Sequence, residues 1–381
     1  MSIETTVQET KAYYCLECGV CTASCPISRL NPGYSPRLFV ERALLEAPAR
    51  VLEAEDLWAC LTCGTCSQRC PSQVDYPEFM RSTRRIAHEA GRAAVATHGG
   101  VLEMLVKLQA KNLPQRRTAW VPRDVRTRDT GDVLYFVGCL PHFQVVFRDL
   151  EVDSLGTARA ALRLLNRVGI EPVVSPDERC CGHDAYWTGE METFETLARL
   201  NVEAIRAAGA KRVVFSCPEG YHTVREIYPR VVGDLPFEPI HLLELLLEEI
   251  EKGALELNEL AAKVTFQDPC RLGRMLGLYE LPRQVLAKIP GLELVEMPRN
   301  RENALCCGSS EWVHCSVCNK EIQIDRLREA RATGTDILVT ACPKCRIHLT
   351  CALRDRDLED PPKLRDLVEL VAESAGGEAH G

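Results

Sequence analysis

Short apolar runs alternate with amphipathic stretches along the chain after residue 131. Such runs are typical of buried strands, and the stretches between them repeat their apolar positions with helical spacing. Four runs end in a cysteine, at residues 133–139, 212–217, 263–270 and 336–342. Helices are expected at 155–169, 194–209, 283–291 and 319–334, and two further strands at 171–175 and 292–297. Because strands and helices alternate, we predict an α/β fold with mainly parallel pairing.

The first 112 residues show a different pattern, without a strand-like apolar run. Helices are expected at residues 35–47, 78–90 and 101–113. The segment that follows carries five arginines, which are Arg116, Arg117, Arg123, Arg126 and Arg128. We therefore expect an α+β multidomain protein. Its predicted parts are a helical domain at 1–112, a linker at 113–131, and two α/β domains at 132–255 and 256–381.

The composition is that of an ordinary folded protein, apart from the cysteines. The 381 residues carry a formal charge of -8, which argues against nucleic acid as a partner because phosphate binding needs a concentrated basic face. No apolar run approaches the roughly 20 residues of a transmembrane helix, and the first residues lack the layout of a signal peptide. A cytoplasmic location is expected, with attachment to a membrane through a partner left open. Twenty cysteines in such a chain point to metal binding rather than to disulfides.

Two cysteine frames near the N-terminus have the spacing of two-cluster ferredoxins. Each reads C-x2-C-x2-C-x3-C-P, at residues 15–26 and 60–71. In this arrangement three cysteines of a frame hold one [4Fe-4S] cubane, and the fourth reaches the other cluster. The expected ligand sets are Cys15, Cys18, Cys21 and Cys70 for one cluster, and Cys60, Cys63, Cys66 and Cys25 for the other. Zinc sites are the alternative, since C-x-x-C pairs also bind zinc, but the repeated frames favour clusters.

The cysteines of the α/β part reveal an internal repeat. Cys139, Cys180, Cys181 and Cys217 recur as Cys270, Cys306, Cys307 and Cys342, at offsets of 131, 126, 126 and 125 residues. Each adjacent pair precedes a glycine, and every group of cysteines follows a predicted strand. Because ligands of parallel α/β sheets bind beyond the carboxyl ends of the strands, we expect the thiols of one repeat to converge on one crevice. A role as small buried core residues does not predict this placement.

These repeats resemble the cysteine-rich CCG domain of the B subunit of heterodisulfide reductase. The N-terminal frames, with a helix between them, resemble the ferredoxin module of heterodisulfide reductase and succinate dehydrogenase iron–sulfur subunits. Over nearly the whole chain, the order of motifs resembles the C and B subunits of heterodisulfide reductase fused into one chain, which is the arrangement of its D-type subunit.

The resemblance implies that a complete five-cysteine motif holds a noncubane [4Fe-4S] cluster. The complete motif of this chain lies in the second repeat, at Cys270, Cys306, Cys307, Cys342 and Cys345. An adjacent pair suits such a site, because two neighbouring side chains can both reach irons of one cluster. The resemblance further implies that this site takes a substrate sulfur and cleaves a disulfide or its equivalent, so these five cysteines are the candidate catalytic residues.

The first repeat departs from the family pattern, because Gly220 stands where the fifth cysteine belongs. Its remaining candidate ligands for a further [4Fe-4S] cluster are Cys139, Cys180, Cys181 and Cys217. Glu219 or His222 could complete an unusual site, and an empty site is the other alternative. Since heterodisulfide reductase proper uses two noncubane clusters, this departure puts that particular reaction in doubt.

Several residues beside these motifs have alternative interpretations. Cys315 and Cys318 form a further C-x-x-C, which fits a zinc site, a redox dithiol or thiols packed beside the cluster. Cys351 is expected in the core. Five histidines near the cysteines are either proton donors or hydrogen-bonding partners that tune a cluster, with His183 the strongest of the set: His142, His183, His222, His314 and His348. The linker arginines are either solvated or a contact strip for an acidic redox partner.

Two functions fit the motifs. In the first, the chain is a redox subunit of a heterodisulfide reductase-like complex, passing electrons from the cubanes to the noncubane site, where a thiol or disulfide reacts. In the second, it is a relay in a larger anaerobic complex of flavin-bifurcating, benzoyl-CoA reductase-type or quinone-linked kind, without a substrate of its own. There is no G-x-G-x-x-G fingerprint and no P-loop. Flavin or nucleotide is therefore expected in a partner, such as a flavoprotein of heterodisulfide reductase A type, a dehydrogenase or a membrane cytochrome.

Overall fold

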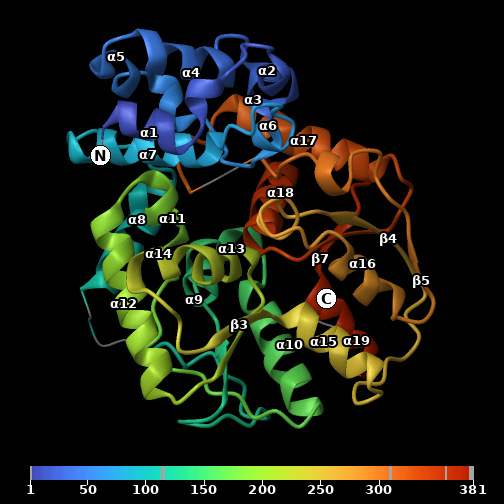
Figure 1. Cartoon of the computed structure of the whole chain (residues 1–381). Helices are drawn as coiled ribbons and strands as arrows, with labels where there is room; N and C mark the ends of the chain where they lie inside the picture. The colour runs from blue at the N-terminus through green and yellow to red at the C-terminus, as the bar shows by residue number, and fades with distance from the viewer. Residues whose placement is uncertain (1, 112, 114–115, 309–310, 357, 377–381) are drawn as a thin grey trace.

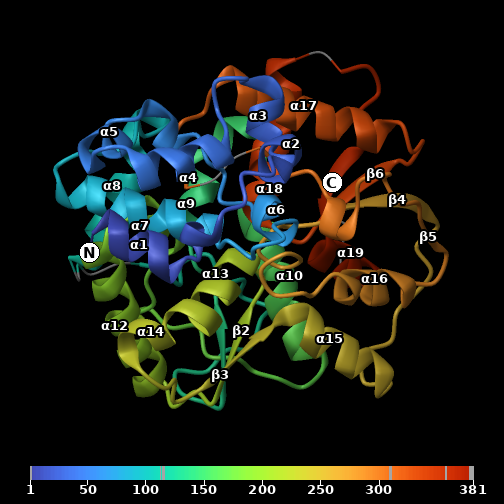
Figure 2. The same cartoon turned by 45° about the horizontal axis from the view of Figure 1, so that its top comes forward.

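The computed structural model of the chain describes residues 2–111, 113, 116–308, 311–356 and 358–376. A helical N-terminal unit lies across two α/β halves. In Figure 1 the unit is blue to cyan, the first half is green to yellow, and the second half is orange to red. Figure 2 shows the same unit from above, against both halves. The predicted α+β multidomain fold is confirmed. Residues 1, 112 and 381, at which predicted domains begin or end, lie outside the described part, and the domain boundaries stay predictions.

The N-terminal unit consists of short helices around the two ferredoxin-type frames. Its helices are α1 (Ile3–Glu9), α2 (Val20–Ser24), α3 (Pro26–Leu30), α4 (Pro36–Leu45), α5 (Pro48–Leu52), α6 (Thr65–Gln68), α7 (Tyr76–Glu89) and α8 (Val101–Ala110). The predicted helices at 35–47, 78–90 and 101–113 correspond to α4, α7 and α8. Side chains of Ser35 and Asp75 accept hydrogen bonds from the first turns of α4 and α7, which satisfies backbone donors that a helix leaves unpaired.

Each α/β half contains one parallel sheet. The first sheet has the order β1 (Val133–Phe136), β2 (Arg212–Phe215), β3 (Glu238–His241). The second has the order β5 (Leu292–Leu294), β4 (Ala262–Gln267), β6 (Ile337–Thr340), β7 (Lys363–Asp366). Every strand pair is parallel, as predicted, and equivalent strands occupy equivalent places in the two sheets.

The edges of the sheets differ from the sequence prediction. The segment 171–175 is not a strand, and only Val173 bridges to Leu134, at the place that β5 takes in the second sheet. Pro172 lacks a backbone N–H, which prevents it from donating to a ladder. The edge strands β3 and β7 were not predicted, because "EPIH" and "KLRD" lack the apolar run of a buried strand.

Helices cover both faces of the two sheets. In the first half they are α9 (Leu140–Val146), α10 (Ser154–Arg167), α11 (His183–Thr188), α12 (Met191–Ala207), α13 (Pro218–His222), α14 (Pro229–Val232) and α15 (Leu242–Glu251). In the second half they are α16 (Glu280–Ala287), α17 (Val317–Arg331), α18 (Pro343–Asp355) and α19 (Leu367–Ser374). The four helices predicted from amphipathic periodicity correspond to α10, α12, α16 and α17.

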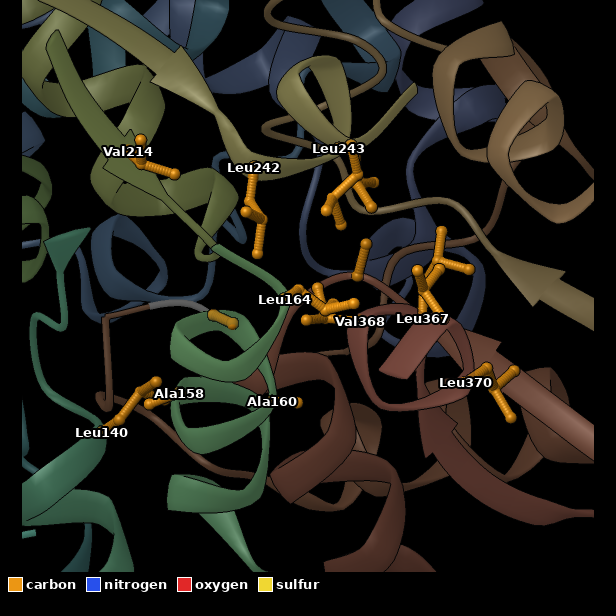
Figure 3. Packing of buried hydrophobic residues seen from close by; sticks show 14 of the residues in the cluster. Leu140, Ala158, Ala160, Leu164, Val214, Leu242, Leu243, Leu367, Val368 and Leu370 are labelled. Carbon is orange, nitrogen blue, oxygen red and sulfur yellow. The ribbon is translucent and has the colours of Figure 1, made fainter. Parts of the chain in front are cut away.

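The two halves share one hydrophobic core through reciprocal helix contacts. Helix α10 of the first half packs against α19 of the second, and α15 of the first packs against α16 of the second. Figure 3 shows Leu164 of α10 beside Val368 of α19, and Leu243 of α15 belongs to the same buried cluster. In each contact, a helix after the first strand of one half meets the helix after the last strand of the other. The repeated halves are therefore related by an approximate twofold arrangement.

The N-terminal unit breaks this symmetry. Its core residues pack in one cluster with Leu305, Cys306, Ile322 and Cys342 of the second half, whereas Cys181 of the first half belongs to another cluster. Helix α3 also packs against α17 of the second half, while α7 and α8 pack on α11 and α12 of the first half. The unit thus touches both halves, but its cysteine-bearing core is continuous only with the second.

We expect Gly189→Ala to weaken the docking of the N-terminal unit. Gly189 has a φ of +86°, and an added Cβ would lie 2.4 Å from the backbone nitrogen of Arg85 in α7. Backbone atoms cannot move aside cheaply, so we expect a loss of about 1–3 kcal/mol from overpacking, measured as a lower thermal unfolding midpoint. The control is Gly209→Ala, which has a φ of +72° but no neighbouring atom within 4 Å. Equal losses in both variants would contradict the contact argument.

Candidate functional site

The eight cysteines of the two ferredoxin-type frames form two groups of thiols. Burial raises the pKa of Cys21, and the neighbouring Cys15 and Cys70 raise it further. Burial raises the pKa of Cys25 to about 12, with contributions from Cys63 and Cys60. Desolvation also raises the pKa of Cys66, and Cys60, Cys63 and Cys25 are among the thiols acting on it. The fourth cysteine of each frame therefore lies with the thiols of the other frame.

The two groups differ in their access to solvent. Cys60, Cys63 and Cys66 are buried, whereas Cys18 is exposed and Cys15 is partly exposed. In both frames a glycine with positive φ begins the helix that follows the second cysteine: Gly19 before α2, at +77°, and Gly64 before α6, at +78°. This left-handed conformation favours glycine, and it turns the third cysteine of each frame back toward the first two.

The structure brings all five cysteines of the second repeat together. Cys270 follows β4, Cys306 and Cys307 lie on the loop after β5, Cys342 begins α18 and Cys345 lies in its first turn. Thiol–thiol hydrogen bonds join Cys306 to Cys270 and Cys307, and these contacts with burial raise the pKa of Cys306 well above its usual range. Further thiol contacts join Cys345 to Cys307 and Cys342. The five sulfurs form one connected, buried group.

The four cysteines of the first repeat also converge. The Sγ atoms of Cys139 and Cys180 lie 3.1 Å apart, and a hydrogen bond joins Cys180 to Cys181. Burial raises the pKa of Cys217, with Cys342 of the second repeat as the next contributor. A cavity is lined by all four thiols, by Glu219 and by Lys344. The first site therefore has the same layout as the second and faces it.

Gly220 occupies the place of the missing fifth thiol. It lies in α13, as Cys345 lies in α18, and a Cβ added to it would be 4.0 Å from the Sγ of Cys181. Its closest neighbour would be Phe215, at 3.5 Å, which is ordinary van der Waals contact. The backbone and the surrounding space at Gly220 would accept a cysteine, so the fold does not exclude a fifth ligand.

A network of ion pairs around buried Lys344 joins the two repeats. Lys344, between Cys342 and Cys345, binds Asp184 and lies 2.9 Å from Glu219. Glu219 holds the same position in the motif "CPEG" that Lys344 holds in "CPKC". Burial disfavours the charge of Lys344, but Asp184 and Glu219 outweigh it and hold its pKa well above the usual range. Equivalent positions of the two repeats thus carry opposite charges that pair across the interface.

Three loops meet where the second frame of the N-terminal unit contacts the second repeat. The thiol of Cys306 packs in the same buried cluster as that of Cys63, close enough for each to act on the pKa of the other. Arg274 donates from Nε to the carbonyl of Cys63 at 2.7 Å and from Nη1 to that of Ala304 at 2.8 Å. One of the ferredoxin-type thiol groups is therefore in direct contact with the complete five-cysteine group.

His183 lies between the two repeats. Its Nε2 accepts a hydrogen bond from Arg271 at 3.1 Å, and its Nδ1 lies 3.0 Å from Asp184. Since Nε2 accepts, the proton of neutral His183 is on Nδ1. Desolvation lowers the pKa of His348 to about 4, and His348 packs on Trp312. His348 is therefore neutral near pH 7. Burial likewise lowers the pKa of His142 and His222.

Two expectations about side residues are corrected. Arg117 is not solvated: it is 4% exposed and donates to Gln109, Gly138 and Glu178. It supports the first site, because Gln109 accepts from the backbone N–H of Cys180 at 2.7 Å. Cys351 is half-buried rather than in the core, and the Nζ of Lys320 lies 2.9 Å from its sulfur.

The other accessory thiols and linker arginines lie nearer the surface. Cys315 is exposed and Cys318 is partly buried. The four remaining linker arginines are exposed, which are Arg116, Arg123, Arg126 and Arg128. The sequence reasoning missed the charged residues of the junctions. Of these, only Lys344 could have been singled out from the sequence, because it aligns with Glu219 in the repeat. No pattern in the sequence distinguishes Arg271 or Arg274.

Family comparisons agree with this architecture. The 4Fe-4S dicluster domain family matches residues 11–74, and the cysteine-rich CCG domain family matches residues 133–225 and 264–350. The D subunit of the dihydromethanophenazine:CoB–CoM heterodisulfide reductase of Methanosarcina acetivorans is 32% identical over 98% of this chain and 96% of its own length. The EtfAB:quinone oxidoreductase of Syntrophomonas wolfei is 28% identical over 74% of this chain and 37% of its own length.

The similarity over the whole length places the chain in a defined class, the iron–sulfur oxidoreductases with a dicluster module and CCG domains. Within that class, the chain belongs to the family of heterodisulfide reductase D subunits. A solved structure of a hypothetical protein from Helicobacter pylori shares the fold, with a TM-score of 0.58 and 13% identity, and the match covers 91% of this chain and 69% of that one. Among the described residues, no helix is both long and apolar enough to span a membrane.

Replacing Lys344 by Met is expected to destabilise the interface between the repeats. It would leave Asp184 and Glu219, which are 14% and 15% exposed, without their cation, and breaking a largely buried pair in this way costs up to about 3–5 kcal/mol. The measurement is the denaturant midpoint of the full chain. Lys252→Met is the matched control, because Lys252 also pairs with two carboxylates, Glu248 and Glu249, but is 54% exposed, where such pairs contribute little. Similar midpoints for both variants would contradict the buried role of Lys344.

Proposed function

We propose that the chain is a redox subunit that passes electrons from its ferredoxin-type centres to the five-cysteine centre of the second repeat, which acts on a thiol or disulfide. The observation that carries this proposal is that Cys63 and Cys306 lie in one buried cluster, with Arg274 donating to the carbonyls of Cys63 and Ala304. This contact joins the N-terminal thiol groups to the one repeat whose cysteine motif is complete. The first repeat has no comparable contact with the ferredoxin-type thiols among the described residues.

The donor sets fit iron–sulfur clusters. We propose cubane ligands at Cys15, Cys18, Cys21 and Cys70 and at Cys60, Cys63, Cys66 and Cys25, and noncubane ligands at Cys270, Cys306, Cys307, Cys342 and Cys345. Burial disfavours the free ionised form of some of these thiols, such as Cys25 and Cys66, whose pKa it raises, and coordination to iron is an interaction that suits such thiols. When bound, such clusters supply one-electron transfer, and the noncubane type supplies reaction with sulfur. The four thiols of the first repeat are proposed ligands of a further cluster.

The side chains around the second site exclude water and fix charge. Trp312 is 4% exposed and lies beside both His348 and Lys344. His348, neutral near pH 7, lies close enough to Cys307 for the charge of that thiol to act on it. Lys344 and Arg271 supply fixed positive charge near thiols that become negative on binding metal. Positive charge near such a site favours its reduced, more negative state.

We propose that electrons enter at the exposed end of the N-terminal unit. Cys18 is exposed there, and Tyr13, Tyr14 and Leu16 are 68%, 65% and 70% exposed. Large exposed apolar side chains beside a redox centre are suited to docking another protein. The relatives that are named as subunits belong to redox assemblies, so the proposed partner is another redox subunit: a flavoprotein of heterodisulfide reductase A type, a dehydrogenase or a membrane cytochrome.

A relay without a substrate of its own is the second candidate function. It is favoured by Gly220, which removes one ligand from the first repeat, and by the similarity to an EtfAB:quinone oxidoreductase. The two candidates differ in whether the second site binds an external sulfur. In the relay, the clusters exchange electrons only with partner proteins.

Low-temperature EPR of anaerobically purified, oxidised protein separates the two functions. With a small thiol such as 2-mercaptoethanol, the catalytic function predicts a paramagnetic signal that changes with the thiol and is lost in Cys307→Ala. Cys351→Ala is the control, since Cys351 lies beside Lys320 rather than in the five-cysteine group. If oxidised protein with full iron content stays silent with thiol, the relay function holds instead.

Gly220→Cys is expected to complete the first site. The new thiol would be placed near Cys181, as Cys345 is placed against Cys307. We expect EPR and Mössbauer signals of the five-cysteine type to double relative to the wild-type protein. Gly220→Ala is the control, because it adds the Cβ without the sulfur and is expected to leave the signals unchanged. Unchanged spectra in Gly220→Cys would show that the fifth ligand is not what distinguishes the repeats.

A further inference from the structure

The loop after Cys270 carries two arginines that hold the second ferredoxin-type frame. Arg271 donates from Nη1 to the carbonyl of Thr62 at 3.0 Å and from Nη2 to its hydroxyl at 2.7 Å. Arg274, three residues further, donates to the carbonyls of Cys63 and Ala304. The second-repeat loop is therefore fastened to the backbone of the residues next to and at Cys63.

Each guanidinium nitrogen of Arg271 makes a hydrogen bond, whereas one nitrogen of Arg274 makes none among the described residues. This nitrogen is Nη2, which is buried. A buried N–H without an acceptor costs about 1–3 kcal/mol, and beside a proposed cluster, whose sulfurs are acceptors, this unpaired donor points toward the cluster. The thiols whose charges act on Arg274 are Cys63, Cys270 and Cys306, and these belong to two different proposed centres.

We propose that Arg274 is a positioning residue shared by two centres, whose Nε and Nη1 hold the loops of Cys63 and Cys306 together while Nη2 donates to sulfur of a bound cluster. The inference rests on the proposed function, since it requires that both thiol groups hold clusters. It extends that function by assigning the junction between them to one side chain that touches both loops.

The physical effect of Arg274 has two parts. Its fixed positive charge favours the reduced state of a nearby cluster, and a hydrogen bond to cluster sulfur acts in the same direction. Its bonds to two carbonyls set the separation of the loops, on which the rate of electron transfer between the centres depends. Met275 packs against Gly64 in the same contact, where an added Cβ would lie 2.9 Å from the Met275 methyl group.

The test compares Arg274→Gln and Arg274→Lys by redox titration followed by EPR, on the full chain with its clusters. In R274Q we expect a lower midpoint potential for the cubane of Cys60, Cys63, Cys66 and Cys25, and an unchanged potential for the other cubane. A tenfold change in the reduction equilibrium corresponds to a shift of about 59 mV for one electron. R274K keeps the charge but not the two-armed bonding, so most of the potential is expected to return.

Stopped-flow reduction measures the second part. Electron transfer to the second-repeat centre is expected to slow at least about tenfold in both variants, because neither bridges the two carbonyls as an arginine does. The control is Arg29→Gln, because Arg29 crosses the same interface to Asp325 at 2.5 Å but is 42% exposed. We expect this variant to match the wild-type protein in potential and rate.

Each outcome decides one of the two claims. Wild-type protein without iron–sulfur signals would overturn the proposed function. Wild-type signals with unchanged potentials and rate in R274Q would overturn the role of Arg274 alone, as would equal changes in R29Q. If R274Q loses iron, the R274K variant is used instead. R274K with full iron content and slowed electron transfer would support the role of Arg274, and R274K with the wild-type rate would overturn it.

Discussion

The buried pair of Arg84 and Glu311 is the interaction on which the assembly of the three parts depends. Both side chains are fully buried, with Nη1 of Arg84 3.1 Å from Oε2 of Glu311. Arg84 comes from α7 of the N-terminal unit, Glu311 from the second half, and Arg84 also donates to the carbonyl of Trp187 in the first half. A buried charge is tolerated only when it is paired and hydrogen-bonded. Arg84 meets this condition because it also donates to backbone carbonyls at Leu57 and Cys60, which places the second cysteine frame.

The duplicated halves share a fold and a layout of thiols, but only the second half has the complete five-cysteine motif. Reciprocal helix contacts bury one core between them, and Lys344 pairs with Glu219 across the interface from the equivalent position. The halves differ at a single ligand position, where Gly220 faces Cys181 and Cys345 faces Cys307. Docking of the N-terminal unit adds a second difference, since Cys63 contacts Cys306 of the second half. The complete motif and the contact with the second ferredoxin-type frame therefore lie in the same half.

Fixed positive charges, as well as burial, determine the surroundings of the thiols. The five-cysteine group is surrounded by cations held in place by partners elsewhere: Lys344 by Asp184 and Glu219, and Arg271 by Thr62 and His183. These cations are therefore anchored by protein groups other than the thiols themselves. Fixed charges of this kind are how a protein sets the potential of a cluster whose chemistry belongs to the cofactor.

The sequence by itself determined the cysteine groups, the duplicated parallel α/β fold and the helical N-terminal unit, because spacing and periodicity are local properties. The strands predicted before Cys139, Cys217, Cys270 and Cys342 formed, each ending two or three residues before its cysteine. It did not determine the edge strands β3 and β7, whose polar residues pair only because a neighbouring strand is present. The roles of Arg117, Arg271 and Arg274 were also decided by the tertiary structure. Their partners lie elsewhere in the chain, and only packing shows which of many arginines is buried against a cysteine loop.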